Sequence, residues 1–263
     1  MDLGPGSPSR TSQAVALTRA GMSRPHTGQG DPGAQRRLCE GMTPIRRPRP
    51  GIWARTRSFD DQVLAAVRAG VPQVVICGAG YDDRALRFRS PGVRFFELDH
   101  PATQADKASR LAAIGARGDV VLAAADFTRA AAAAVLAGCG HVAAQPSLFL
   151  CEGLLVYLDQ PVITSLLTGL RTVAAPGSTL AASLAVHSDD ADSRRVLDVA
   201  NARRRNGQAE PWRTILPAGA QLALFRQSGW QHLAAVDAAQ LEPDAPPGRS
   251  LLVTASPAAA ASA

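Results

Sequence analysis

Lysine and aromatic residues are scarce in this chain of 263 residues. Lys107 is the one lysine, so arginine supplies the remaining positive charge, and Phe, Trp and Tyr make up 5% of the chain. A formal net charge of +6 and a pI of about 9.9 would ordinarily suggest a nucleic-acid partner. The arginine-rich segments 46–57 and 194–205, however, offer few interleaved aromatic side chains on which bases could stack. We therefore expect no nucleic-acid partner.

Signals for an oxidising compartment or a membrane are also missing. The four cysteines show no paired spacing, and two of them, Cys77 and Cys151, end apolar runs, a setting typical of buried free thiols. No apolar run reaches the length of a membrane span, and no signal-peptide hydrophobic region stands near residue 1. We expect a cytoplasmic protein with no disulfide, no metal site and no membrane partner.

What the chain does contain is a Gly-x-Gly turn between an apolar run and an expected helix, in the sequence VVICGAGYDDR at residues 74–84. Gly78 and Gly80 allow a tight turn and the close approach of a ligand to the backbone. A second apolar run ends in Asp99, about twenty residues beyond the glycines, where a carboxylate accepts hydrogen bonds from both hydroxyls of a ribose. This pattern is typical of the β-α-β unit that binds a nucleoside.

The same turn departs from the dinucleotide fingerprint at its third glycine. Asp83 takes that place, so a pyrophosphate at the N-terminus of the expected helix would face Asp82 and Asp83 and be repelled. A nucleoside without phosphates meets no such repulsion. The turn therefore favours S-adenosylmethionine over NAD as the ligand.

Strand and helix patterns alternate through the rest of the chain. We expect strands at residues 73–77, 93–98, 119–124, 147–151, 178–184, 231–236 and 250–255. We expect helices at residues 58–69, 82–89, 102–114, 128–138, 160–174 and 218–227. This alternation predicts an α/β fold, a Rossmann-like, doubly wound and mostly parallel sheet of seven strands as in class I methyltransferases.

Three further regions flank or interrupt this domain, which we expect to span residues 52–255. Residues 1–51 are rich in Gly, Pro and Arg and predict a loose N-terminal cap segment with a short helix at 12–19. A polar and basic stretch near 188–216 predicts a helical insertion that forms part of the substrate pocket. Residues 256–263 form a low-complexity tail.

Acidic residues follow three successive strands, at the edge where an open parallel sheet binds its ligands. Asp99 ends the second strand, Asp126 and Phe127 follow the third, and Glu152 follows the fourth. We expect Asp126 to accept a hydrogen bond from an adenine amino group, Phe127 to pack on the ring, and Glu152 to offset a sulfonium charge. The alternative for Glu152 is an acid that stabilises the start of the following helix.

Several ordered motifs resemble those of the leucine carboxyl methyltransferase family, namely QVVICGAGYDDRALRF, VRFFELDHPATQADKASRL, and FLCEGLLVYL followed by APGSTL. That family includes eukaryotic protein-phosphatase carboxyl methyltransferases and many bacterial S-adenosylmethionine-dependent O-methyltransferases. The resemblance covers roughly residues 55–185. It implies that the cofactor is S-adenosylmethionine and that it contacts Gly78, Asp99, Asp126, Phe127 and Glu152.

The segment RTRSFDD at residues 55–61 resembles the arginine-bearing helix of the same family. In that helix an arginine pairs with the methionine carboxylate of the cofactor. The resemblance assigns this role to Arg57, with Arg55 as the rival.

No nucleophile, base or metal cluster marks a catalytic residue, and His187 after the fifth strand is more typical of a loop histidine than of a general base. Methyl transfer from a sulfonium depends mainly on in-line positioning, so this does not exclude catalysis. We expect an S-adenosylmethionine-dependent O-methyltransferase that acts on a carboxylate or hydroxyl of a small molecule, or on a protein carboxylate. The alternatives are an NAD-dependent oxidoreductase and a non-catalytic S-adenosylmethionine-binding protein, and the acceptor and the oligomeric state stay open.

Overall fold

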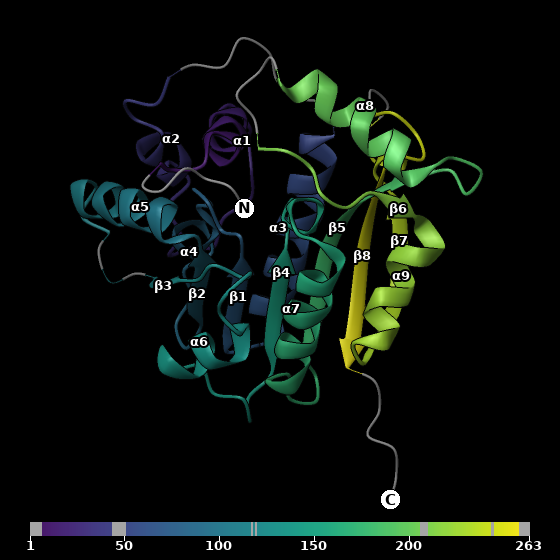
Figure 1. Cartoon of the computed structure of the whole chain (residues 1–263). Coiled ribbons are helices and arrows are strands. Elements are labelled where there is room, and N and C mark those ends of the chain that lie inside the picture. The colour runs from purple at the N-terminus through teal and green to yellow at the C-terminus, as the bar shows by residue number, and fades with distance from the viewer. Residues whose placement is uncertain are drawn as a thin grey trace, which may run out of the picture.

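The computed structural model describes residues 7–43, 51–116, 118, 120–205, 210–242 and 245–257. Its strands lie side by side in one sheet in the order β3-β2-β1-β4-β5-β8-β7 (Figure 1). Their bounds are Gln73–Cys77 (β1), Arg94–Asp99 (β2), Val121–Ala124 (β3), Ser147–Cys151 (β4), Thr179–His187 (β5), Trp230–Asp237 (β7) and Ser250–Pro257 (β8).

The first five strands of the sheet run parallel, and β8 is antiparallel to both β5 and β7. The sheet thus confirms the predicted doubly wound, mostly parallel α/β fold with its seven main strands. A two-residue strand that the sequence did not predict, β6 (Leu216–Pro217), pairs with the end of β5.

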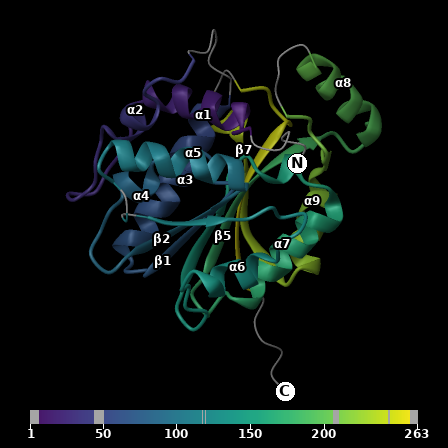
Figure 2. The ribbon, with the colours of Figure 1, turned by 60° about the vertical axis from the view of Figure 1, so that its left-hand side comes forward.

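Helices cover both faces of the sheet. One face carries α3 (Ile52–Arg68), α4 (Arg84–Arg87) and α5 (Pro101–Ala113), and the other carries α6 (Ala132–Gly138), α7 (Gln160–Thr172) and α9 (Ala218–Gln227) (Figure 2). Successive strand residues point to opposite faces, so Val75 packs toward α6, α7 and α9 while Val74 packs toward α3, α4 and α5. Burial on both faces explains the nearly continuous apolar runs of β1 and β4.

The helix predicted at 82–89 is much shorter than expected, since only Arg84–Arg87 are helical. Asp82 and Asp83 are both buried, and the Asp82 carboxylate accepts a hydrogen bond from the Arg84 N–H at 2.8 Å. The two acids therefore belong to the turn before the helix.

The segment before the sheet is more ordered than predicted. It forms α1 (Arg10–Ala20) and also α2 (Ala34–Leu38), in a region expected to be irregular. Leu38 is fully buried against the core on the α3 face, which explains why this short helix is held in place. The parts of the predicted cap and tail at residues 1–6, 44–50 and 258–263 lie outside the described residues.

The predicted insertion contains one helix, α8 (Ser193–Arg205), which leads to a segment returning to β6. His187 precedes this helix at the end of β5. Its two ring nitrogens contact the Ser188 carbonyl and the Ser193 hydroxyl, each at 2.7 Å. His187 thus closes the turn into α8, as expected for a loop histidine. Within the described ranges, no helix has the length and apolar character needed to cross a membrane.

A buried ion pair joins β2 to α5. The Lys107 ammonium contacts the Glu97 carboxylate and donates a hydrogen bond to the Asp82 carbonyl at 2.6 Å. Burial raises the pKa of Glu97 to about 7, although the positive charge of Lys107 opposes that rise. In the folded protein Glu97 therefore takes up a proton at a much higher pH than a free glutamate does.

Glu97 should make the protein less stable as the pH rises from 4.5 to about 7. In this range the folded state binds a proton at Glu97 that the unfolded chain has already lost, so this contribution to the free energy of unfolding falls with rising pH. Glu97→Gln should flatten this part of the profile when urea unfolding is measured across the range. Glu40→Gln, at an exposed position, should keep the wild-type slope. An equally steep profile in the Glu97 variant would contradict the assignment.

Candidate functional site

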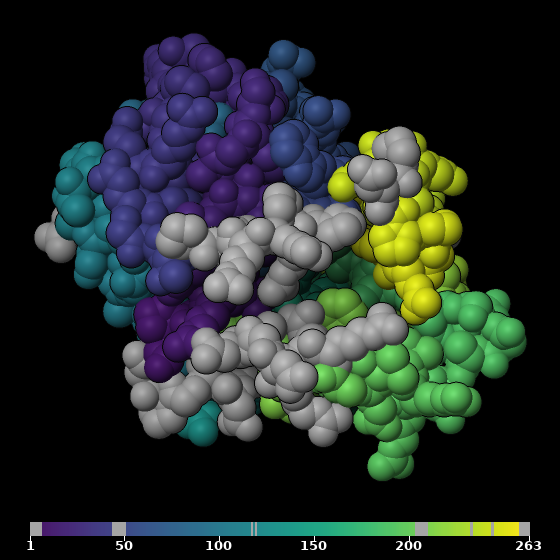
Figure 3. Space-filling model, turned by 90° about the horizontal axis from the view of Figure 1, so that it is seen from above, coloured from purple at the N-terminus to yellow at the C-terminus, as the bar shows by residue number. Residues whose placement is uncertain are grey.

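A cavity of about 430 Å³ opens at the edge of the sheet where the parallel strands end. This volume is typical of small-molecule sites, which span about 300–1,000 Å³. Its walls come from α1, α3, the turn after β1, the end of β2, the loop after β4 and the insertion. Figure 3 looks onto this edge and shows N-terminal residues and residues near β8 on opposite sides of a hollow. It is the edge at which open α/β sheets bind their ligands.

The two glycines of the Gly-x-Gly turn have different neighbours. Both have positive φ, +66° at Gly78 and +51° at Gly80, a conformation that other residues rarely adopt. Gly78 lines the cavity, and a Cβ added to it would lie 2.9 Å from Leu154. A Cβ on Gly80 would lie 2.6 Å from the Cβ of Ser12. The close approach that Gly80 permits is therefore to α1, whereas the sequence predicted a ligand there.

Asp99 lies in the cavity wall, where the sequence predicted a ribose-binding carboxylate. The N–H groups of Gly80 and His100 each donate to one of its oxygens at 2.6 Å. Burial raises the pKa of Asp99, and these two hydrogen bonds act in the opposite direction. Each oxygen keeps a lone pair for a further donor, so the carboxylate is fixed in position and able to accept from two hydroxyls.

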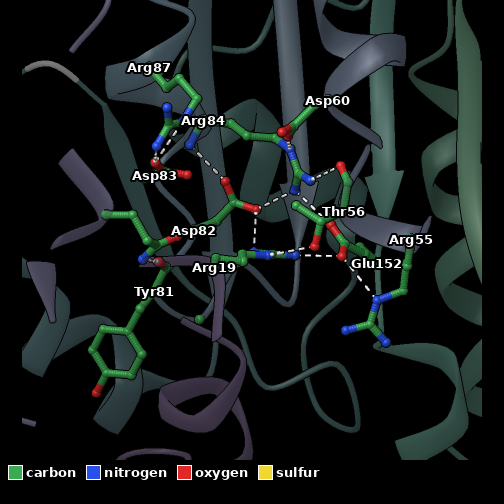
Figure 4. Close-up of polar contacts among 12 residues, drawn as sticks. Arg19, Arg55, Thr56, Asp60, Tyr81, Asp82, Asp83, Arg84, Arg87 and Glu152 are labelled. Carbon is green, nitrogen blue, oxygen red and sulfur yellow. Dashed lines mark hydrogen bonds and ion pairs between the residues drawn. The ribbon is translucent and has the colours of Figure 1, made fainter. Parts of the chain in front are cut away.

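A network of five arginines and four carboxylates reaches from the cavity wall into the protein, and Figure 4 shows most of it. The carboxylates are Asp60, Asp82, Asp83 and Glu152, and the arginines are Arg19, Arg24, Arg55, Arg84 and Arg87. These residues come from α1 and the segment after it, from α3, from the turn into α4 and from the loop after β4. The network thus joins the N-terminal segment to the sheet.

Arg84 lies at the centre of this network and its side chain is fully buried. It contacts Asp60 at 2.7 Å, Asp82 at 2.5 Å and Glu152 at 2.7 Å, and it also donates to the Thr56 carbonyl at 3.2 Å. A guanidinium suits this position because its planar fork presents several donors at once.

Glu152 is held in the cavity wall by three arginines. Arg19 lies 2.5 Å from its carboxylate, Arg84 2.7 Å and Arg55 3.0 Å. Burial alone would raise the pKa of Glu152, but these positive charges hold it well below its usual value. The short helix that follows begins at Leu155 and has no side-chain cap, so the helix-start alternative for Glu152 is wrong.

Arg57 does not reach this site. It is exposed on α3 and absent from the cavity wall, whereas Arg55, two residues earlier on the same helix, lines the cavity. Two positions along a helix turn a side chain by roughly 200°, so the two arginines cannot share one face. Gly153 makes room for Arg55, because a Cβ at Gly153 would lie 3.1 Å from its guanidinium. The site therefore contains the rival, Arg55, in place of Arg57.

The predicted repulsion at the Gly-x-Gly turn also needs correction. Asp82 pairs with Arg19 and Arg84, and Asp83 pairs with Arg24 and Arg87. Burial would raise the pKa of Asp83, yet the charges of its two arginines lower it. The acids are thus neutralised within the protein, and the charge argument against a pyrophosphate loses its force.

Asp126 and Phe127 are absent from the cavity wall. Asp126 accepts hydrogen bonds from the N–H and hydroxyl of Thr128 at 3.0 and 2.7 Å, and it lines a smaller, separate cavity of about 250 Å³. Phe127 packs against the core on the α7 face. Tyr157 borders both cavities. The predicted adenine contacts of Asp126 and Phe127 gain no support from this arrangement and stay a prediction.

The buried ion pairs made by the arginines of the N-terminal segment were not predicted from the sequence. Arg19 lines the cavity, and Arg24 is buried against Asp60 and Asp83 at 2.7 and 2.6 Å. The insertion meets the same segment through Glu210, which accepts hydrogen bonds from the Ser9 hydroxyl at 2.7 Å and from the Thr11 hydroxyl. These arginines lie next to small residues in a segment with little periodicity. The sequence pattern therefore did not indicate that they pair with acidic residues far away in the chain.

Comparison with known proteins places this geometry in context. The model of the leucine carboxyl methyltransferase family matches residues 15–171, more than half of the chain. A protein of Parafrankia sp. (strain EAN1pec) named as a putative S-adenosyl-L-methionine-dependent methyltransferase is 45% identical over 130 residues, 48% of this chain and 42% of that protein. One of the same description from Mycobacterium avium (strain 104) is 33% identical over 184 residues, 68% of this chain and 60% of that protein. The chain thus spans only about half of the length of such relatives.

Solved structures show the same fold at low sequence identity. A putative methyltransferase from Thermobifida fusca is 17% identical, with a TM-score of 0.61 over 97% of each chain. Magnesium protoporphyrin IX methyltransferase from Synechocystis, solved with bound S-adenosylhomocysteine, is 12% identical, with a TM-score of 0.55 over 84% of this chain and 91% of that one. These similarities establish the class I methyltransferase fold.

Removal of the central arginine should cost much of the protein's stability. Arg84→Met leaves Asp60, Asp82 and Glu152 without a shared partner, and loss of one member of a buried ion pair typically costs about 3–5 kcal/mol. The free energy of unfolding in urea measures the effect. Arg129→Met is the matched control, because Arg129 is 87% exposed and lies 3.7 Å from Asp126, and it should change stability by less than about 0.5 kcal/mol. Equal effects of the two substitutions would contradict the role of Arg84.

Proposed function

This chain belongs to the leucine carboxyl methyltransferase family, and from that premise we propose that it binds S-adenosylmethionine and methylates an oxygen of an acceptor molecule. The observation that carries the proposal is the cavity at the sheet edge. Asp99, Glu152 and Arg55 all line this cavity. Their chemistry matches the three polar parts of the cofactor: a ribose, an ammonium group and a carboxylate. When bound, S-adenosylmethionine supplies an electrophilic methyl group.

Arg55 is the residue that we assign to the cofactor carboxylate. Its Nε donates to Glu152 at 3.0 Å, and its two Nη atoms have no hydrogen-bond acceptor within the described part of the chain. Arg19, the other arginine in the wall, already donates from all three nitrogens to Thr56, Asp82 and Glu152. A free pair of N–H groups is what a two-point contact with a carboxylate requires.

Glu152 and Asp82 are the acceptors that we assign to the ammonium group of the cofactor. Both carboxylates line the cavity and are paired with arginines. Asp99, fixed by two backbone N–H groups, would accept from the ribose hydroxyls. These residues bind and orient the cofactor, and methyl transfer to an acceptor oxygen then depends on alignment.

We further propose that residues 52–255 form the methyltransferase domain and that the N-terminal segment acts as its cap. The contribution of α1 to the cavity wall supports this division. The four free cysteines support a reducing compartment such as the cytoplasm as the place of action. The methyl acceptor is either a small molecule or a protein carboxylate.

Calorimetric titration with S-adenosylhomocysteine and with NADH tests the cofactor, and labelled S-adenosylmethionine mixed with cell extract tests methyl transfer. We expect heat from S-adenosylhomocysteine alone and label in an extract component. Binding of NADH alone would favour an oxidoreductase. Binding of S-adenosylhomocysteine without any transfer would favour a non-catalytic binding protein.

Asp99→Asn should weaken S-adenosylhomocysteine by at least about tenfold, because hydrogen bonds to a charged acceptor contribute about 1.5–3 kcal/mol. The same titration measures this loss, and circular dichroism verifies the fold. Asp61→Asn, an exposed change on α3 outside the cavity, should bind like the wild type. Unchanged affinity of a folded Asp99 variant would remove this residue from the site.

Arg55→Lys should weaken S-adenosylhomocysteine by about tenfold and leave 5′-methylthioadenosine, which lacks the amino-acid part, almost unaffected. Arg57→Lys is the control on the same helix and should spare both ligands. Parallel titrations of the two variants measure the difference. Equal losses for both ligands in the Arg55 variant would mean that Arg55 supports the protein's structure, and a selective loss in the Arg57 variant would restore the original assignment.

A further inference from the structure

The cofactor residues account for only one part of the cavity. A second part is bordered by the ends of β5 and β8 and by the insertion, and it includes Ser183, Ala185, Arg249, Ser250, Tyr157 and Trp212. Ala185 of β5 pairs with Ser250 of β8, so the start of β8 lies at the same sheet edge as the end of β5. This second part therefore adjoins the cofactor residues on the side of β5.

Arg249 stands out among the charged residues of the cavity wall. The other two arginines there, Arg19 and Arg55, are both paired with Glu152. The Arg249 side chain makes no hydrogen bond or ion pair to any described residue, while its carbonyl accepts from the Val186 N–H at 3.0 Å. The backbone is thus anchored to the sheet, and the exposed guanidinium carries a positive charge that the described protein does not neutralise.

Two aromatic side chains border the same region, in a chain with few aromatic residues. Trp212 is positioned by the insertion, since Asn201 of α8 donates to its carbonyl and accepts from its N–H, both at 2.8 Å. Tyr157 comes from the short helix after β4. Two small residues of β5, Ser183 and Ala185, line the same cavity and leave space for a flat group.

On the basis of the proposed function, we propose that the methyl acceptor is a small aromatic carboxylic acid whose carboxylate binds Arg249 and whose ring packs against Trp212 and Tyr157. A guanidinium pairs with a carboxylate through two parallel hydrogen bonds, which distinguishes an acid from a neutral analogue. Aromatic rings prefer offset or edge-on contacts with other rings, which favours a planar acceptor over a flexible one. Arg249 thus determines which acceptors bind, and it has no part in holding the cofactor.

Titration with 2-naphthoate and its neutral analogue 2-naphthamide, each with and without saturating S-adenosylhomocysteine, tests this inference. The wild type should bind the acid at least about tenfold more tightly than the amide. Arg249→Gln should weaken binding of the acid until its affinity is similar to that of the amide. It should leave the affinity for S-adenosylhomocysteine unchanged. Trp212→Leu should weaken both probes. Arg226→Gln, an exposed arginine on α9 away from the cavity, should keep the wild-type preference.

Equal affinity for acid and amide in the wild type, failure of both to bind, or a preference that survives in Arg249→Gln would each overturn the inference. An equal loss of preference in Arg226→Gln would do the same, since it would point to net charge in place of a specific contact. Failure of the proposed function has a different signature, because S-adenosylhomocysteine would then not bind while the preference for the acid, tested without it, would persist.

Discussion

The buried guanidinium of Arg84 is the contact on which the arrangement of the cavity depends. It bridges a carboxylate of α3, a carboxylate of the turn after β1 and Glu152 after β4, so three separate segments share one charged centre. Through Asp82 and Glu152 the same centre also holds Arg19 of α1. Burial of so many charges is tolerable only because each has close partners. The cavity wall, the N-terminal segment and the sheet are consequently held together by one cooperative set of ion pairs.

Much of the fold and part of the site follow from local patterns in the sequence. Nearly continuous apolar runs define β1, β2 and β4 because these strands are buried on both faces and are bounded by turn residues. The Gly-x-Gly turn and Asp99 are found because their chemistry is encoded within one β-α-β unit. The structure brings Gly78, Asp99 and Glu152 together as that reasoning predicts.

The features that escaped prediction depend on side-chain direction or on partners far away in sequence. Arg55 and Arg57 are residues of the same type on the same helix. Only the orientation of α3 about its axis decides that Arg55 lines the cavity and that Arg57 is exposed. Asp83 has the pattern of a charged helix start, yet Arg24, 59 positions earlier, neutralises it. No periodic pattern in the sequence predicts such a pair. The contact between Glu210 and the start of α1 could not be predicted for the same reason.

The burial of Lys107 has a consequence for the chemistry of the molecular surface. Lys107 is the one lysine of the sequence, and it is held between Glu97 and the Asp82 carbonyl with only 1% of its surface exposed. The folded protein therefore presents no lysine side chain to acylating reagents, amine cross-linkers or lysine-specific proteases. Modification of this amine requires α5 to separate from β2, so the rate of lysine acylation would report the opening of that part of the domain.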